Sequence, residues 1–385
     1  MSREQLVLGI DFGTSFSSAA AWVNGKLFLV PDERGEPCIP SALFIPRKGP
    51  PIVGFRALQL AVGEPQLGVR GLKRILGRSV EDPAVRLFEA QNAARVKAGP
   101  RGLILRVAQR DFAATQLAAE VFRTLKSMAE ARFRLPAEKA VVTLPTAADR
   151  SAQDAVVEAA RLAGIEVVQT VPEPTAAAVA YGLDRSSTED RRLLIYDFGG
   201  GTFDVTVLRQ VGTQFTPLAL GGDPLLGGDD LDEALARLVG RQVWTQYRLE
   251  LDKDVVRWQR VLLQSEAVKR ALSGTDEIHL RIRDLFTAGP LRDLDLPVSR
   301  ADANQVWQEY VERTLQVTAR TMMQANMRPK DVDEVVLVGG STYIPMVQQR
   351  VAKMMGRPGE RHGDPQTAVA AGAAILAARV LRLAA

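Results

Sequence analysis

The sequence predicts an α/β protein made of two similar lobes, and two observations support this prediction. Predicted strands and helices alternate along much of the chain, which is typical of α/β folds. In addition, a strand–turn–strand motif occurs twice, at Leu6–Trp22 and Leu193–Leu208, with Asp-Phe-Gly after each apolar strand. The two aspartates, Asp11 and Asp197, are 186 positions apart in a chain of 385 residues. A repeat at half the chain length indicates two lobes whose motifs face one shared cleft.

The first half of the chain is predicted to alternate strands with helices. Ser151 is expected to cap a helix that runs to Ala163, and Gly164 is placed to end it. Glu173 lies between two prolines, which favours extended backbone at that point. The other predicted elements are strands within Lys26–Pro51, a strand pair in Gly99–Asp111, a helix at Ala113–Phe133, and strands at Ala140–Leu144 and Ile165–Thr170.

The second half continues this pattern after the repeated motif. An acidic run, Asp229–Asp232, suits a helix start, because acidic side chains stabilise helix N-termini. The apolar strand Val335–Val338 leads into a glycine turn, Gly339–Pro345. The predicted helices are Val255–Ser273, Ala303–Met327 and Thr367–Leu383, and the stretch Asp276–Pro297 is expected to be β-rich. Four polar residues share one face of the first of these helices, where a solvent-facing salt bridge is the simplest account: Glu266, Lys269, Arg270 and Ser273.

The glycine turn of the second motif is suited to binding phosphate. Gly199, Gly200 and Gly201 lack side chains that would block a ligand, and successive amide N–H groups in such a turn form an anion-binding concavity. Asp197 would repel a phosphate unless a cation lay between them, which implies Mg²⁺. A tight hairpin without a ligand is the alternative for this motif alone, and the repeat favours a nucleotide site. The basic cluster GLKRILGR, at 71–78, taken by itself indicates a solvent-facing surface.

Composition and motifs argue against several other classes of protein. The formal net charge of +4 is spread along the chain without a Lys/Arg block, so no nucleic-acid partner is expected. The longest small-apolar run, Thr367–Ala385, is interrupted by two arginines, so a packed helix is expected and no membrane partner. The single cysteine, Cys38, and an N-terminus without a signal-peptide layout predict a cytoplasmic protein. The motifs of phosphate-loop NTPases and the His-Arg-Asp loop of protein kinases do not occur.

Seven ordered blocks of sequence carry a resemblance to a known family. The blocks are IDFGTSFS, LKRILGR, PEPTAAAVAYGLD, YDFGGGTFDV, LGGDDLD, SEAVKRALS and VLVGGSTYIP. They resemble the nucleotide-binding domain of the seventy-kilodalton heat-shock chaperones (DnaK-like), in the actin-like ATPase superfamily. The resemblance implies duplicated ribonuclease-H-like lobes around a nucleotide cleft. It places lobe I at 1–186, with an inserted subdomain at about 40–112, and lobe II at 187–385, with one at about 229–300. The family's peptide-binding domain is absent from these residues.

The resemblance implies a role for each matching residue. Lys73 resembles the lysine that contacts the γ-phosphate and the attacking water, which replaces the solvent-facing interpretation of its cluster. Asp11 and Asp197 resemble the carboxylates that hold Mg²⁺, mainly through water. The residues implied in catalysis are Lys73, Glu173, Asp197, Thr202 and Asp204. Those implied at the phosphates are Gly13, Thr14, Ser15, Gly199, Gly200, Gly201, Thr202, Gly228 and Asp229. Those implied at the adenosine are Glu266, Lys269, Arg270, Ser273, Gly339, Gly340, Ser341 and Tyr343.

Four positions depart from the family pattern. Tyr343 replaces an arginine that stacks on adenine, and we expect its aromatic ring to stack there instead. Gln366 replaces an aspartate that makes a minor ion or water contact. Gln153 and Gln169 replace arginines that receive the interdomain linker and J-domain cochaperones. A neutral amide cannot form the charge-assisted pair of an arginine, so weakened or altered J-domain coupling is expected.

The function implied by the resemblance is slow hydrolysis of ATP to ADP and phosphate, with the nucleotide state controlling lobe closure. The implied cofactors are ATP or ADP and Mg²⁺, with K⁺ as a further candidate cation. The implied partners are the nucleotide, a nucleotide-exchange factor and a J-domain cochaperone, and a monomer is expected. An actin-like filament protein is the alternative, followed by a small-molecule kinase of the same superfamily.

Overall fold

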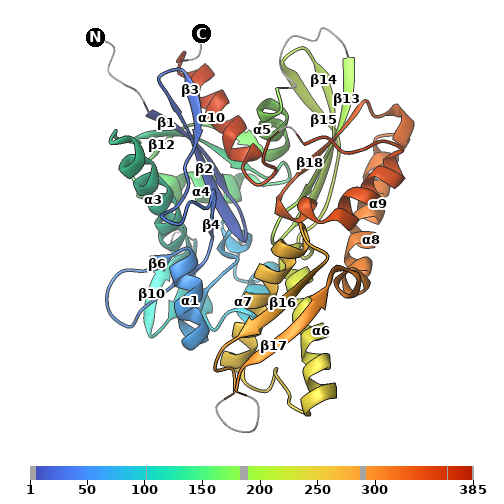
Figure 1. Cartoon of the computed structure of the whole chain (residues 1–385). Coiled ribbons are helices and arrows are strands. Elements are labelled where there is room, and N and C mark those ends of the chain that lie inside the picture. The colour runs from blue at the N-terminus through green and yellow to red at the C-terminus, as the bar shows by residue number, and fades with distance from the viewer. Residues whose placement is uncertain (1–5, 101, 183–189, 287–291, 362, 384–385) are drawn as a thin grey trace.

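Two large β-sheets, one in each lobe, organise the computed structural model, which describes residues 6–100, 102–182, 190–286, 292–361 and 363–383 (Figure 1). The sheet of the first lobe has the order β12-β11-β1-β2-β3, with β4 paired to β2. Its strands are β1 (Leu6–Phe12), β2 (Phe16–Val23), β3 (Lys26–Leu29), β4 (Cys38–Pro40), β11 (Lys139–Leu144) and β12 (Glu166–Pro172).

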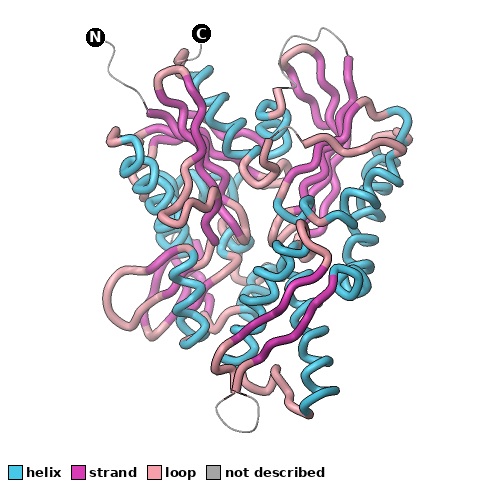
Figure 2. Tube along the Cα trace, in the orientation of Figure 1, coloured by secondary structure: helices cyan, strands magenta, loops and turns pink. Residues whose placement is uncertain are grey.

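The sheet of the second lobe repeats the centre of the first (Figure 2). Its order is β15-β14-β13-β18. Strand β13 pairs antiparallel with β14 and parallel with β18, as β1 pairs with β2 and β11. The strands are β13 (Asp190–Phe198), β14 (Phe203–Val211), β15 (Gln214–Asp223) and β18 (Glu334–Val338). The predicted repeat is therefore confirmed, and with it the α/β fold in two lobes.

Helices form three layers around the two sheets (Figure 1). Helices α3 (Ala114–Phe133) and α4 (Arg150–Leu162) cover the outer face of the first sheet. Helices α8 (Arg300–Gln324) and α9 (Pro345–Met355) cover the outer face of the second. Between the sheets lie α5 (Glu173–Ala180) and α10 (Ala368–Val380), whose alanines pack against buried valines and leucines of both. The two lobes thus share part of one hydrophobic core.

Each lobe carries a smaller α/β unit beyond its sheet, at the bottom of Figure 1. In the first lobe this unit contains β5 (Leu43–Phe44), β6 (Ile52–Val53), α1 (Phe55–Gly63), β7 (Gly68–Val69), α2 (Pro83–Gln91), β8 (Arg95–Gly99), β9 (Gly102–Val107) and β10 (Arg110–Ala113). In the second it contains α6 (Gly228–Tyr247), α7 (Val255–Leu272), β16 (Glu277–Ile282) and β17 (Leu294–Ser299). Short 3₁₀ helices are η1 (Pro65–Leu67), η2 (Leu72–Ile75), η3 (Pro329–Asp331) and η4 (Gly340–Tyr343).

Some predicted details of these elements are wrong and one is confirmed. Asp149, not Ser151, caps α4, because its carboxylate accepts from the amide of Ala152 at 2.8 Å. The strand pair predicted at Gly99–Asp111 is confirmed as β9 and β10, which β8 extends to a three-stranded sheet. Helix α8 begins earlier than predicted, since Ser299 caps its first turn. The predicted lobe boundary at 186 and 187 lies outside the described residues, so the predicted lobe ranges stay predictions.

Candidate functional site

A cavity of ≈ 930 Å³ lies between the two lobes. This volume is within the range of about 300–1,000 Å³ that is usual for ligand pockets. The turns after β1 and β13 line it from opposite sides, so the two copies of the repeated motif face each other. The predicted site residues on its wall are Asp11, Gly13, Thr14, Ser15, Lys73, Glu173, Asp197, Gly199, Gly200, Gly201, Thr202, Asp204, Glu266, Lys269, Arg270, Gly339, Gly340 and Ser341.

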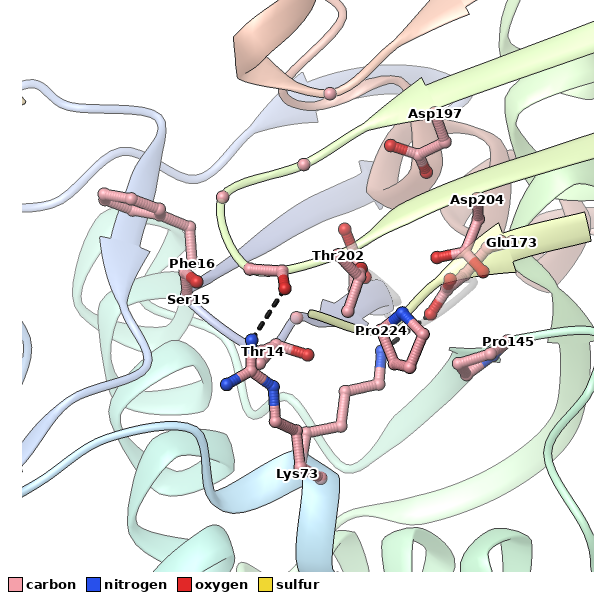
Figure 3. Close-up of a pocket in the computed structure, with 18 of the residues that line it drawn as sticks. Thr14, Ser15, Phe16, Lys73, Pro145, Glu173, Asp197, Thr202, Asp204 and Pro224 are labelled. Carbon is pink, nitrogen blue, oxygen red and sulfur yellow. Dashed lines mark hydrogen bonds and ion pairs between the residues drawn. The ribbon is translucent and has the colours of Figure 1, made fainter. Parts of the chain in front are cut away.

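The turns of the two lobes approach each other closely. Figure 3 shows Thr14 and Ser15 of the first lobe facing the loop that leads to Thr202. Ser15 Oγ donates to Asp229 Oδ2 in the second lobe at 2.7 Å. A Cβ added at Gly201 would lie only 2.6 Å from Ser15 Oγ, so a side chain here would displace the Ser15 hydroxyl. The glycines therefore allow contact between the lobes as well as access for a ligand.

Two further segments hold the glycine turn from the second lobe. The oxygen of Gly199 accepts from the amide of Gly228 at 3.0 Å and from the hydroxyl of Ser341 at 2.9 Å. The oxygen of Gly200 accepts from the amide of Asp229 at 2.7 Å. Gly228 and Asp229 themselves do not lie on the cavity wall. They are placed to support the turn from behind.

Lys73 projects into the cavity from η2 and pairs with Glu173, the first residue of α5. The distance from Lys73 Nζ to Glu173 Oε1 is 2.7 Å, and both side chains are largely buried. Figure 3 shows this pair beside Asp197 and Asp204. Burial by itself lowers the pKa of Lys73, but the carboxylates of Glu173, Asp11 and Asp204 outweigh it and raise this pKa above its ordinary value. The lysine is therefore cationic at neutral pH.

The carboxylates around Lys73 carry more negative charge than one lysine can balance. Burial and the charge of Glu173 raise the pKa of Asp11 to about 7 and that of Asp204 to about 6. Burial, together with Glu173, Asp204 and Asp11, raises the pKa of Asp197 well above its usual range. Such mutual repulsion favours a bound cation.

The donor set fits Mg²⁺ held mainly through water. Within the described part of the chain, no three acidic, histidine or cysteine side chains lie close enough to ligate a metal by themselves. Mg²⁺ usually keeps several waters and takes one or two carboxylates plus substrate phosphates. Asp11 and Asp197, on opposite sides of the cavity next to the two glycine turns, fit that arrangement.

The polar face of α7 turns toward the cavity and forms none of the local salt bridges that its spacing allows. Lys269 Nζ donates to Asp232 Oδ2 and to the oxygen of Gly228, both at 2.8 Å. Arg270 pairs across the cavity mouth with Glu36 of the first lobe at 2.9 Å. Ser273 lies off the cavity wall, and its hydroxyl donates to the oxygen of Lys269 at 3.5 Å. Three of the four predicted residues on this face thus reach the cavity.

Tyr343 also lies off the cavity wall. Its hydroxyl donates to Asp364 Oδ1 at 2.7 Å, and the guanidinium of Arg361 stands 5.8 Å from the centre of its ring. The ring is thus held against neighbours at the C-terminal side of the second lobe. Gln366 instead lines the cavity, and its amide nitrogen would lie 2.6 Å from a Cβ added at Gly340.

Gln153 and Gln169 lie outside this cavity wall, on the first lobe. The Gln153 amide donates to the oxygen of Ala148 at 2.9 Å, which ties it to the start of its own helix. Gln169 is exposed on β12, the edge strand of the first sheet. Gln169 therefore presents a neutral side chain to the surface.

Comparison with known families gives one match that spans almost the whole chain. The Hsp70 protein family matches residues 7–383. The chain belongs to the Hsp70 family. Its two lobes are therefore those of an Hsp70 nucleotide-binding domain, in the actin-like ATPase superfamily, and members of this family are ATPases. Among the described residues, no helix is long and apolar enough to cross a membrane.

Sequence reasoning missed several residues that contact the predicted site of this Hsp70-family chain. Asp232, the buried partner of Lys269, gave no signal beyond its place in an acidic helix start. Glu36 and Asp364 lie in loops without a recognisable motif, so neither pairing was foreseeable. Arg74 lines the cavity next to Lys73, and its basic cluster was the one available signal.

Proposed function

We propose that this chain binds Mg-ATP in the cavity between its lobes and hydrolyses it slowly to ADP and phosphate. The observation that carries the proposal is the Lys73–Glu173 pair at 2.7 Å, set among further buried carboxylates beneath two facing glycine turns. Phosphoryl transfer needs positioning and neutralised charge more than covalent chemistry from the protein. This site provides backbone amides for phosphate oxygens, a buried cation and acids that orient water.

Each residue has a separate task in this mechanism. Mg²⁺, held by Asp11 and Asp197 through water, would neutralise phosphate charge. The ammonium of Lys73 stabilises charge that develops on the γ-phosphate and orients the attacking water. Glu173 holds Lys73 in place through their ion pair. Asp204, which receives a hydrogen bond from Thr202, orients water at the same end of the cavity.

Slow turnover is expected because the carboxylate nearest Lys73 is held in an ion pair. Glu173 accepts a hydrogen bond from Lys73 at 2.7 Å, so this carboxylate is not free to act on the attacking water. A general base must be free and within hydrogen-bond reach of the proton that it takes. The adenosine would lie against α7 at Glu266, Lys269 and Arg270 and over the turn Gly339–Ser341. In this proposal, the nucleotide state controls lobe closure.

The proposed setting is that of a cytoplasmic, monomeric, chaperone-type ATPase that works with a nucleotide-exchange factor. We further propose that J-domain stimulation is weak, because Gln153 and Gln169 offer no positive charge at positions where the family uses arginine. Steady-state hydrolysis with and without a J-domain protein tests this. The double variant Gln153→Arg/Gln169→Arg should gain stimulation, and strong stimulation of the unaltered chain would contradict the proposal.

Lys73→Ala tests the proposed hydrolysis. The variant should lose hydrolysis by about 10²-fold or more in single-turnover phosphate release, since removal of one transition-state donor costs about 10²–10³ in rate. Its affinity for Mg-ADP, measured by calorimetry, should stay within a few-fold of the unaltered chain. Lys97→Ala, which removes an exposed ion pair with Asp111, is the matched control. Unaltered turnover in Lys73→Ala would overturn the assignment of Lys73.

A further inference from the structure

Arg74 reaches across the cavity from the first lobe to the second. Its Nη2 donates to the backbone oxygen of Gly201, in the glycine turn of the second lobe, at 2.6 Å. Its Nη1 donates to Gln91 Oε1, on α2 of the first lobe, at 3.1 Å. A guanidinium is planar and holds its donors in a fixed geometry. One side chain therefore connects η2, α2 and the opposite glycine turn at set distances.

The packing around Gly201 leaves this contact little freedom. A Cβ added at Gly201 would lie 2.6 Å from Ser15 Oγ, 3.0 Å from Thr14 Cγ2 and 3.1 Å from Arg74 Nη2. The Nε of Arg74 is buried and has no hydrogen-bond partner among the described residues. Burying an unpaired donor costs free energy. The guanidinium thus holds its position although one of its groups has lost hydration.

A solvated arginine on a basic surface would be expected to point into water or to pair with a neighbouring carboxylate. The shorter of the two hydrogen bonds of Arg74 is instead with main chain, at the turn whose amides would bind phosphate. Moving that carbonyl moves the amides beside it. A contact to this atom therefore acts on the geometry of the whole glycine turn.

We propose that Arg74 is a positioning residue for phosphoryl transfer, which fixes the turn Gly199–Thr202 at a set distance from Lys73. The inference rests on the proposed nucleotide hydrolysis. Lys73 and Arg74 both lie on the short helix η2. Lys73 donates to Glu173, and Arg74 donates to the backbone oxygen of Gly201. A phosphate held by the glycine turn is thereby kept in line with the Lys73 ammonium. Misplacement by about 1 Å can cost about 10²-fold in rate.

The test compares Arg74→Ala and Arg74→Lys with Arg86→Ala, an exposed arginine on α2. Three readouts are needed: single-turnover hydrolysis of Mg-ATP, calorimetric affinity for Mg-ADP, and hydrogen–deuterium exchange of residues 198–206 in the nucleotide-free chain. Arg74→Ala should lose about 10- to 100-fold in hydrolysis rate. Its Mg-ADP dissociation constant should change less than about threefold, because the turn amides remain. Exchange in the glycine turn should become faster.

Arg74→Lys should give a hydrolysis rate between those of Arg74→Ala and the unaltered chain. An ammonium can donate to Gly201, but it cannot bridge to Gln91 in the same fixed geometry. Arg86→Ala should match the unaltered chain in all three readouts. The proposal fails if Arg74→Ala hydrolyses ATP at the unaltered rate, or if hydrolysis and Mg-ADP affinity fall by equal factors. If the unaltered chain bound no nucleotide, the proposed function would fail, and the exchange readout alone would decide whether Arg74 fastens the turn.

Discussion

Four carboxyl groups and one ammonium line the same cavity, and their charges do not balance. Asp11, Asp197 and Asp204 have raised pKa values, caused first by burial and then by the charge of Glu173. Lys73 offsets this repulsion only in part. In the nucleotide-free chain, the site is therefore a source of instability at neutral pH, which a bound cation would relieve.

The substitution Asp11→Asn should show how the destabilisation by these carboxylates depends on pH. The pKa of Asp11 is about 7 in the folded chain, against 3.8 as its ordinary value. Between those values the folded state binds more protons than the unfolded state, so the stability contributed by Asp11 falls as pH rises. Asparagine cannot ionise. Relative to the unaltered chain, Asp11→Asn should therefore gain stability as the pH rises from about 4 to about 7, in urea unfolding without nucleotide and with EDTA.

Asp111→Asn is a control of opposite sign for that experiment. Asp111 is exposed, and a hydrogen bond from Lys97 holds the pKa of its carboxyl below the ordinary value. Its contribution to stability is therefore lost as the pH falls through that lowered pKa, and no gain should appear near neutral pH. Parallel stability curves for Asp11→Asn and the unaltered chain would contradict the assigned charge repulsion.

The placement of single residues was predictable where local sequence determines it. Asp11 and Asp197 are the next-to-last residues of β1 and β13, just before the glycine turns, and the structure places both on the cavity wall. Ser273 and Tyr343 were predicted at the cavity but lie off its wall. Their hydroxyls bond instead to other groups, one in the same helix and one in a later loop. The hydroxyl of Ser273 returns to its own helix, and that of Tyr343 bonds to Asp364 in a later loop. No spacing rule in the sequence encodes such competition.

At the scale of elements, the middle layer depends on how closely backbones can approach. A Cβ added at Gly372 of α10 would lie 1.8 Å from the oxygen of Ala176 in α5. That neighbour is main chain, so it cannot rotate away. Gly240 of α6 offers the opposite case, since its nearest neighbour would be the Trp258 ring at 3.9 Å.

These two helical glycines should respond to alanine with opposite signs. Gly372→Ala should destabilise the chain by about 1–3 kcal/mol, because the middle layer must separate to accept the methyl group. Gly240→Ala should stabilise it by about 0.5–1 kcal/mol, the usual gain when alanine replaces glycine inside a helix. Thermal and urea unfolding of both variants measure this difference. Equal effects would show that the approach of α10 to α5 is not limiting.

Elements were predictable in kind from apolar periodicity, and their ends were less so. Helix α4 was predicted to have Ser151 as its cap, but it begins at Arg150 with Asp149 as its cap. Ser151 donates instead to the backbone oxygen of Gly77 at 2.8 Å. That second contact joins α4 to the segment after η2, far away in sequence. Tertiary partners of this kind decide which of two adjacent polar residues serves as the cap.

At the scale of the whole molecule, the lobes are joined both behind and across the cavity. The middle layer of α5 and α10 forms the connection behind it. Ser15 bonds to Asp229 beside the glycine turns, and Arg270 pairs with Glu36 at the end lined by α7. Under the proposed function, the contacts across the cavity would open for ligand release while the middle layer holds. Weakening the contacts across the cavity should therefore change the dissociation rate of the ligand more than the free energy of unfolding.

Glu36→Ala should accelerate release of Mg-ADP. The Glu36–Arg270 pair is partly exposed, and such pairs contribute about 0.2–1 kcal/mol, which corresponds to about a 1.5- to 5-fold faster dissociation rate. Stopped-flow displacement of a fluorescent ADP analogue measures it, and the effect should shrink as salt screens the pair. Glu233→Ala, which removes an exposed pair within α6, is the matched control.

Arg270 also faces the proposed nucleoside site, so Arg270→Ala by itself would mix two effects. A double-mutant cycle of Glu36→Ala and Arg270→Ala separates them, because the coupling term contains only their interaction. If the pair restrains lobe opening, Glu36→Ala should have no further effect on release once Arg270 is gone. A dissociation rate that responds to Glu36→Ala equally in both backgrounds would instead show that Glu36 acts on release without Arg270.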